Sequence, residues 1–274
     1  MNYTVLLVLQ GAVLLGITSG ALGTFALLRQ QSLLGDAISH AALPGIVVMF
    51  LLTHSKNPWI LLCGGALAGI VGVASVQYVC THTKLKKDAI LGIILSVFFG
   101  FGLVLMTVVQ KIPVASQAIL NKFLFGNVAT LLAHDVCVIA VISLCIFAML
   151  ILFWKECSMY VFDPVFAHTI GCNTKIIEMI LTMLLVLAIV IGLQTVGVVL
   201  MSTMLIAPAA AARQWTVRLS RMLLLSSIFG GGAAFIGVYV SSLVDHIPTG
   251  PAIVIVASAT VLFSLMCAPK RNIG

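Results

Sequence analysis

Near-continuous apolar runs fill most of this chain and are separated by short polar breaks. A helix needs about 20 apolar residues to cross a bilayer, whereas the strands of a membrane barrel alternate over about ten residues. The runs do not alternate, and they predict an all-α, polytopic membrane protein with about eight or nine transmembrane helices. We expect these spans at roughly 3–28, 32–52, 58–80, 89–110, 134–154, 175–193, 196–211, 222–243 and 250–267.

The number of helices depends on the break at Gly192-Leu193-Gln194-Thr195. The runs on either side of it form either two helices or one long bent helix with a re-entrant piece. The longest connection, at about 111–133, contains Pro113 and Gly126-Asn127, and we expect an external loop there with a short interfacial or re-entrant helix. We find no internal repeat and no soluble stretch, so residues 1–274 are expected to form a single transmembrane domain.

The composition supports membrane insertion, and the distribution of basic residues predicts the topology. The chain is 62% hydrophobic and only 8% charged, against about 25% charged residues in soluble proteins. Its net charge of +7 does not indicate nucleic-acid binding, because the basic residues are scattered among short loops. With the loop at 81–88 in the cytoplasm, eleven of the fourteen Lys and Arg residues are cytoplasmic, which places the N-terminus outside and the C-terminus inside. No basic residues precede the first run, so we expect it to be a retained helix and not a cleaved signal peptide.

One polar pair interrupts the second predicted span. Asp36 and His40 are four residues apart, so on a helix both side chains point the same way. A carboxylate in hydrocarbon costs at least about 2.5–3.5 kcal/mol and is tolerated where it faces a bundle interior or an aqueous path. Carboxylate and imidazole together are ligands for a divalent first-row metal, so the pair indicates a cation pathway. A structural role for Asp36, bonded to a neighbouring helix, is the alternative, and Ser39 is expected to bond along its own helix.

The chain contains none of the commonest nucleotide-binding or hydrolytic motifs. Neither G-x-x-x-x-G-K-[ST] nor H-E-x-x-H nor G-x-S-x-G occurs, so we expect a transport subunit and not an enzyme. Asp36 is the one acidic residue placed well within a predicted span, whereas a gradient-driven carrier usually has several. This favours a passive pathway gated by a separate ATPase. A gradient-driven cation carrier or channel acting alone is the alternative.

A basic segment at about 208–221 follows the seventh predicted span. Pro208 can end or kink that span, and the alanines after it restart a helix. Arginines alternate there with apolar residues: Arg213, Arg218 and Arg221 with Trp215, Val217 and Leu219. The pattern is typical either of a cytoplasmic turn that follows the charge bias or of a short helix that docks into a cytosolic ATPase.

Several segments of the chain resemble the integral membrane permease subunits of ABC-type manganese, zinc and iron transporters. The most specific of them is the run LLRQQSLLGDAISHA at 27–41, which is followed by Pro44-Gly45. The other matching segments are DAILGI at 88–93, LFGN at 124–127, FDPVFA at 162–167, QTVGVVL at 194–200, LIAPAAAAR at 205–213 and IPTGP at 247–251. The chain departs from the family pattern at His246, where the family usually has an acidic residue, and Asp245 lies one position earlier.

The resemblance implies an ABC importer permease bundle, type II-like, in the bacterial cytoplasmic (inner) membrane. Such permeases work as dimers on two cytosolic ATPase subunits, surrounded by membrane lipid, and receive metal from an extracytoplasmic binding protein. It further implies that Asp36 and His40 of both protomers coordinate the passing ion, and that the segment at 208–221 couples the permease to the ATPase. The divalent metal (Mn²⁺, Zn²⁺ or Fe²⁺) is the cargo, and no cofactor is expected to stay bound.

Several points stay open at the level of sequence. Ser39, Gln194, Asp245 and His246 are secondary candidates for the pathway or its mouth. Aspartate suits Mn²⁺ or Fe²⁺ and imidazole suits Zn²⁺, so the pair does not select the metal. The permease dimer is formed by identical or by different chains. A permease for a metal chelate is a further alternative, although only 8% of the residues are aromatic and none cluster near Asp36.

Overall fold

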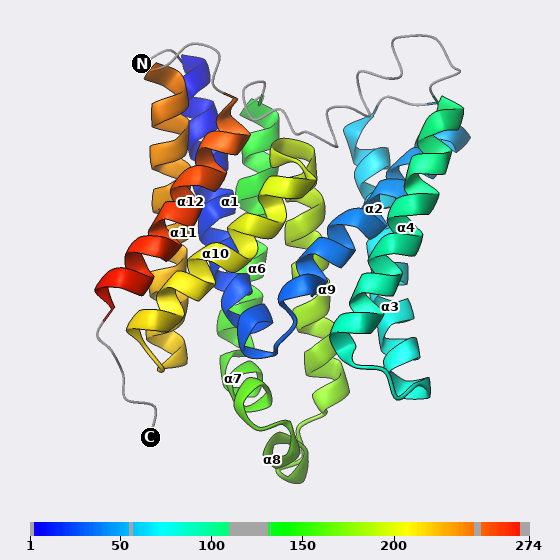
Figure 1. The fold of residues 1–274 in the computed structure, drawn as a ribbon, viewed down its shortest axis with the longest axis vertical. Coiled ribbons are helices and arrows are strands. Elements are labelled where there is room, and N and C mark those ends of the chain that lie inside the picture. Colours follow the sequence, from blue (N-terminus) through cyan, green and yellow to red (C-terminus); the bar gives the residue numbers. More distant parts are fainter. Residues whose placement is uncertain (1–2, 55–56, 110–130, 132, 244–247, 269–274) are drawn as a thin grey trace. The chain divides into compact units, whose positions relative to one another are not determined.

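The regular structure of the chain is entirely helical over the residues that the computed structural model describes, which are 3–54, 57–109, 131, 133–243 and 248–268. The long helices (Figure 1) are α1 (Tyr3–Leu28), α2 (Ser32–Thr53), α3 (Pro58–His82), α4 (Lys87–Val109), α6 (Ala133–Leu152), α9 (Thr174–Val196), α10 (Val198–Trp215), α11 (Leu219–Leu243) and α12 (Thr249–Cys267). Two short helices, α7 (Trp154–Phe162) and α8 (Pro164–Thr169), connect α6 to α9. Most of the expected loop at 111–133 lies outside the described residues, as do Asp245 and His246.

Eight helices in the described part of the chain are long and apolar enough to cross a membrane: α1, α2, α3, α4, α6, α9, α11 and α12. The expectation of an all-α, polytopic membrane protein is therefore confirmed. Local signals set the helix ends. Asn57 caps α3 by accepting a hydrogen bond from the Trp59 backbone N–H at 3.1 Å, and α2 ends where His54 adopts a left-handed φ of 47°.

The break between the sixth and seventh predicted spans lies at Gly197. Helix α9 continues through Gly192 and Gln194, and the chain leaves the helical conformation only at Gly197, which has a φ of 86°. The expected break at 192–195 is thus wrong by a few residues. A positive φ costs glycine little, which is why the turn between the two helices falls there. The region forms two helices, α9 and α10.

Helix α10 runs through Pro208 without ending. A proline removes a backbone hydrogen bond and crowds the preceding turn, but packing against neighbouring helices can hold such a helix together. A Cβ on Gly23 of α1 would strike the carbonyl oxygen of Leu205, and a Cβ on Gly230 of α11 would lie 3.5 Å from Pro208 Cγ. The expectation of a separate short helix after Pro208 is therefore wrong. Residues 213–218 are instead the end of α10 and the turn into α11.

The described helices group into two compact units. Unit 1 comprises residues 1–30, 128–181 and 203–274, and unit 2 comprises residues 31–127 and 182–202. In unit 1, α1 and α11 approach so closely that Ser226 Oγ donates a hydrogen bond to the Gly20 carbonyl oxygen at 2.6 Å. In unit 2, α2 packs on α3, where Gly45 lies against the backbone of Gly64. Small residues permit this close helix packing in lipid.

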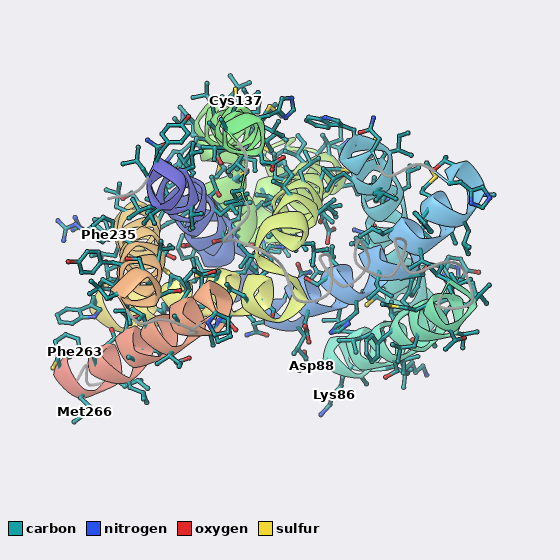
Figure 2. The ribbon with its side chains drawn as sticks, turned by 90° about the horizontal axis from the view of Figure 1, so that it is seen from above. Lys86, Asp88, Cys137, Phe235, Phe263 and Met266 are labelled. Atoms are coloured by element: carbon teal, nitrogen blue, oxygen red, sulfur yellow. The ribbon has the colours of Figure 1, made fainter. Side chains whose placement is uncertain are left out.

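Apolar side chains cover outer faces of the spans. Figure 2 shows Phe235, Phe263 and Met266 of unit 1 on the outside of their helices, and Met266 is 87% exposed. Lys86 and Asp88 mark the polar start of α4 in unit 2 (Figure 2). Exposed apolar residues along helices of this length fit contact with lipid.

Candidate metal pathway

Asp36 and His40 lie on the same face of α2, in the part of the helix that belongs to a candidate span. His40 Nε2 is 3.6 Å from Asp36 Oδ1, and the two side chains are 20% and 35% exposed. Ser39, between them, is fully buried, and its hydroxyl donates to the Gly35 carbonyl oxygen at 2.8 Å. The local bond expected for Ser39 is thereby confirmed. Asp36 and His40 are both partly exposed.

The imidazole of His40 is oriented by packing while one of its nitrogens lacks a partner. Phe99 of α4 packs edge-on against the ring, with centroids 4.7 Å apart and an interplanar angle of 74°. His40 Nδ1 is buried and has no hydrogen-bond partner among the described residues. A buried polar atom without a partner is costly. The nitrogen that faces the Asp36 carboxylate is the other one, Nε2.

The pair offers two donors for one ion. His40 Nε2 and Asp36 Oδ1 are 3.6 Å apart. An ion about 2.1 Å from both atoms would make an N–metal–O angle of roughly 120°. Within the described residues, no group of three or more His, Cys, Asp or Glu side chains could hold a metal. One copy of the described chain therefore presents part of a coordination sphere.

The comparisons with known proteins decide the family. Residues 1–268 match the ABC 3 transport family. The chain belongs to this family. It is a membrane permease subunit of an ABC transporter, which confirms the resemblance found in the motifs.

Individual relatives of this permease are similar over nearly its whole length. The zinc transport system membrane protein TroC of Treponema pallidum is 47% identical, over 99% of this chain and 91% of TroC. The manganese transport system membrane protein MntC of Bacillus subtilis is 45% identical, over 97% of this chain and 61% of MntC. Among solved structures, a chain of PsaBC from Streptococcus pneumoniae in complex with Fab matches with a TM-score of 0.85 and 30% identity, covering 99% of this chain and 94% of that one.

The permease places the remaining predicted residues in different settings. Gln194 lies on α9, one turn before Gly197. Pro208 is buried in unit 1, whereas Arg213, Arg218 and Arg221 are exposed around the turn between α10 and α11. The side chain of Trp215 fastens this turn, since its indole N–H donates to Ser264 Oγ on α12, which in turn donates to the Ala211 carbonyl oxygen at 2.8 Å.

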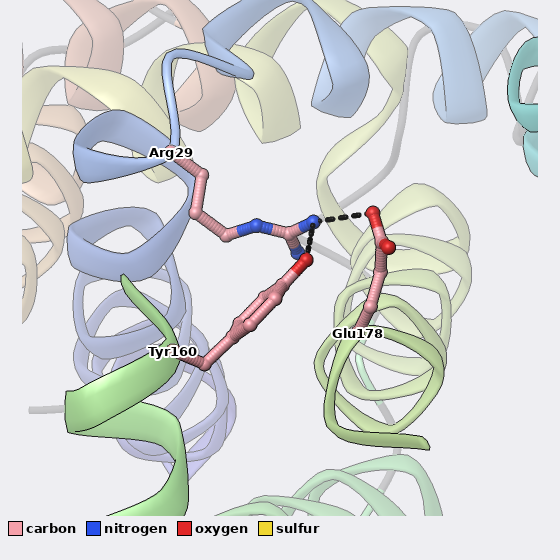
Figure 3. Close-up of polar contacts among 3 residues, drawn as sticks. All are labelled: Arg29, Tyr160 and Glu178. Atoms are coloured by element: carbon pink, nitrogen blue, oxygen red, sulfur yellow. Dashed lines mark hydrogen bonds and ion pairs between the residues drawn. The ribbon is translucent and has the colours of Figure 1, made fainter. Parts of the chain in front are cut away.

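The sequence did not predict a partly buried ionic cluster. Arg29, which follows α1, contacts Tyr160 of α7 and Glu178 of α9 (Figure 3), all within unit 1. Opposite charges near the ends of two spans were the available signal, but nothing local in the sequence pairs them.

Proposed function

We propose that this permease moves divalent metal ions, Mn²⁺, Zn²⁺ or Fe²⁺, into the cell across the bacterial cytoplasmic membrane. The observation that carries this proposal is the Asp36–His40 pair on α2, with Asp36 Oδ1 and His40 Nε2 3.6 Å apart and both side chains partly exposed. Carboxylate and imidazole suit all three ions. The names of the relatives agree, since TroC is a zinc and MntC a manganese transport system membrane protein.

Two permease chains would complete the coordination sphere. One pair supplies about two or three donor atoms, which is too few to replace the water of a divalent ion. Two pairs supply about four to six donors, and their two carboxylates balance the two charges of the ion. We therefore place the pathway between two copies of α2, contributed by identical or sister chains. Weak coordination is expected because a transport site must release its ion.

Energy would come from cytosolic ABC ATPase subunits, and the ion from an extracytoplasmic binding protein. The chain has no P-loop of its own. The exposed Arg213, Arg218 and Arg221 would contact the ATPase, and the buried Pro208 would pass the motion into the packed helices α10 and α11. Gln194, Asp245 and His246 stay secondary candidates for the pathway or its external mouth.

Helix α8 provides a second surface for the same partner. Phe162, Val165, Phe166 and Ile170 are 53–72% exposed, and all lie outside the candidate spans. Within unit 1, α8 lies toward the same end as the turn between α10 and α11 (Figure 1). Exposed apolar residues and exposed arginines toward one end of a unit suit a protein partner. The ATPase that must bind at this end is the partner that the proposed function supplies.

The proposed topology has an external N-terminus and a cytoplasmic C-terminus. It requires α10 to cross the membrane as a ninth helix. Although α10 is not among the eight candidate spans, Leu205, Ala211 and Ala212 are fully buried against the spans of unit 1. This direction places α8 and the three arginines in the cytoplasm, as the positive-inside rule favours.

Uptake of radioactive manganese and zinc tests the metal proposal. Cells that lack this chain would be given the wild type, Asp36→Asn, or Asp88→Asn as a control that removes an exposed carboxylate of α4. We expect the wild type and Asp88→Asn to restore uptake of one metal, and Asp36→Asn to fail at equal membrane abundance. Rescue by Asp36→Asn would make that residue structural. Rescue of neither metal by the wild type would contradict the proposed cargo.

Proteoliposomes test whether the permease needs its partners. Metal flux through the purified chain alone would favour a gradient-driven carrier or channel. Flux only with ATPase, binding protein and ATP supports the proposal. Arg218→Glu or Arg221→Glu should lower metal-stimulated ATP hydrolysis, while the control Lys86→Glu, an exposed charge of the loop before α4, should not. Unchanged hydrolysis and ATPase co-purification in the arginine variants would contradict their role in docking.

A further inference from the structure

The guanidinium of Arg29 is buried among three helices of unit 1. Its side chain is only 8% exposed, and Nη2 donates to Glu178 Oε1 at 2.7 Å and to Tyr160 Oη at 3.2 Å. The guanidinium carbon also lies 5.0 Å from the centroid of the Tyr160 ring (Figure 3). Only the guanidinium is buried, since the Glu178 side chain is 32% exposed and Tyr160 is half-buried. Loss of Glu178 or Tyr160 would leave the buried Arg29 charge with fewer partners.

Helix α7 uses one face to pack against the end of α1. Trp154, Cys157 and Tyr160 are spaced by three residues and therefore share a face. The Trp154 ring meets Phe25 of α1 edge-on at 6.4 Å, and Cys157 is 1% exposed. Tyr160 continues this face to Arg29. The contacts fix α7 along its length.

The same guanidinium holds the chain on both sides of α8. Tyr160 precedes α8 by four residues, and Glu178 follows after the chain has turned at Gly171, where φ is 91°. Helix α8 begins at a firm cap, because Asp163 Oδ1 accepts a hydrogen bond from the Phe166 N–H at 2.9 Å. The exposed helix α8 thus lies in the chain between α7 and α9, and both of these helices contact Arg29.

Arg29 also stands next to the turn that leads to the metal-bearing helix. Gln30 has a left-handed φ of 55°, and α2 begins at Ser32. Arg29 therefore precedes the start of the helix that carries Asp36 and His40 by three residues.

We infer that Arg29, held by Tyr160 and Glu178, is a positioning residue that transmits movement of α8 to the start of α2. The inference rests on the proposed function, in which α8 contacts the ATPase and α2 carries the metal ligands. When the ATPase displaces α8, Tyr160 and Glu178 move with it. Arg29, which is bonded to both, then moves as well and shifts the turn at Gln30. A cluster with this role affects how much metal is moved for each ATP.

Metal uptake and ATP hydrolysis, measured together on the complete transporter in proteoliposomes, test this role. The variants are Glu178→Gln and Tyr160→Phe, which keep size and shape, and the control Lys175→Gln, which removes an exposed charge of the same helix α9. We expect metal moved per ATP to fall about fivefold or more in Glu178→Gln, as is typical of lost coupling between sites, and less in Tyr160→Phe. Lys175→Gln should match the wild type. The exchange Arg29→Glu with Glu178→Arg should recover part of the loss shown by either single change.

Other results would overturn the inference. Unchanged metal per ATP in Glu178→Gln and Tyr160→Phe would do so. A parallel fall in uptake and hydrolysis, together with a lower melting temperature, would show that the cluster only stabilises the fold. If the wild-type transporter neither moved metal nor hydrolysed ATP in response to it, the proposed function itself would fail, and this inference with it.

Discussion

His40 Nε2 lies 3.6 Å from Asp36 Oδ1, one helical turn along α2. The separation is too long for a hydrogen bond, so the two groups do not satisfy one another. Both remain accessible to a ligand, and Phe99 limits the orientations of the imidazole. A carboxylate and an imidazole held apart in this way are suited to share one cation between them.

The identity of the side chain at position 40 should influence which metal passes. In His40→Cys a soft thiolate replaces the imidazole, and thiolates favour Zn²⁺ over Mn²⁺. We expect the ratio of zinc to manganese uptake to rise by about tenfold or more. His40→Ala should abolish uptake of both metals at normal membrane abundance. An unchanged ratio in His40→Cys and normal uptake in His40→Ala would remove His40 from the pathway.

Phe99 should support transport without binding the ion. Its edge-on contact with His40 is worth about 0.5–1.5 kcal/mol, so Phe99→Ala should lower metal uptake by roughly three- to tenfold. Phe101→Ala on the same helix is the matched control, because Phe101 is 54% exposed. Initial uptake rates at equal membrane abundance measure the effect. Equal rates in the two variants would show that the contact does not position His40.

The sequence predicted the spans, and the position of Asp36 and His40 on one face of a helix, because both follow from local patterns. The runs in α1 and α2 are continuous, and the spacing of Asp36 and His40 is one turn of any helix. The contact with Phe99 was not predictable, because α4 is apolar on all sides and its periodicity selects no face. Residues 59 positions apart in sequence meet here only through tertiary packing.

The connection between α6 and α9 shows a second limit of prediction from the sequence. Arg29 pairs with Glu178 across 149 positions, which no local pattern reveals. The short helices α7 and α8 were missed, although Asp163-Pro164 is a good start signal, because helices of nine and six residues fall below the length that periodicity detects. At Pro208 the sequence suggested that a helix ends, but α10 continues through this residue. Pro208 lies close to Gly230 of α11, and this packing supports the helix there.

Gly20 and Gly232 should respond differently to the same substitution. A Cβ on Gly20 would lie 2.5 Å from the Ser226 carbonyl oxygen, whereas nothing lies within 4 Å of a Cβ on Gly232. We expect Gly20→Ala to lower the free energy of unfolding by about 1–3 kcal/mol through overpacking. Gly232→Ala should raise it by about 0.5–1 kcal/mol, because alanine restricts the unfolded chain. Melting temperatures of the purified permease in detergent measure both, and equal shifts would contradict the close approach of α1 and α11.

Cys157 should be inert to alkylation in the folded permease. Burial raises the pKa of its thiol to about 11, the Glu156 carboxylate acts in the same direction, and Arg29 opposes them. Only the thiolate reacts, so about one molecule in a thousand is reactive at pH 8, and this fraction grows about tenfold for each pH unit up to the pKa. In a variant that keeps only Cys157 and Cys172, maleimide at pH 8 should modify Cys172, which lies beyond α8, and spare Cys157 until the protein is denatured. Modification of both thiols at the same rate would show that the face of α7 carrying Cys157 and Tyr160 is not packed against α1.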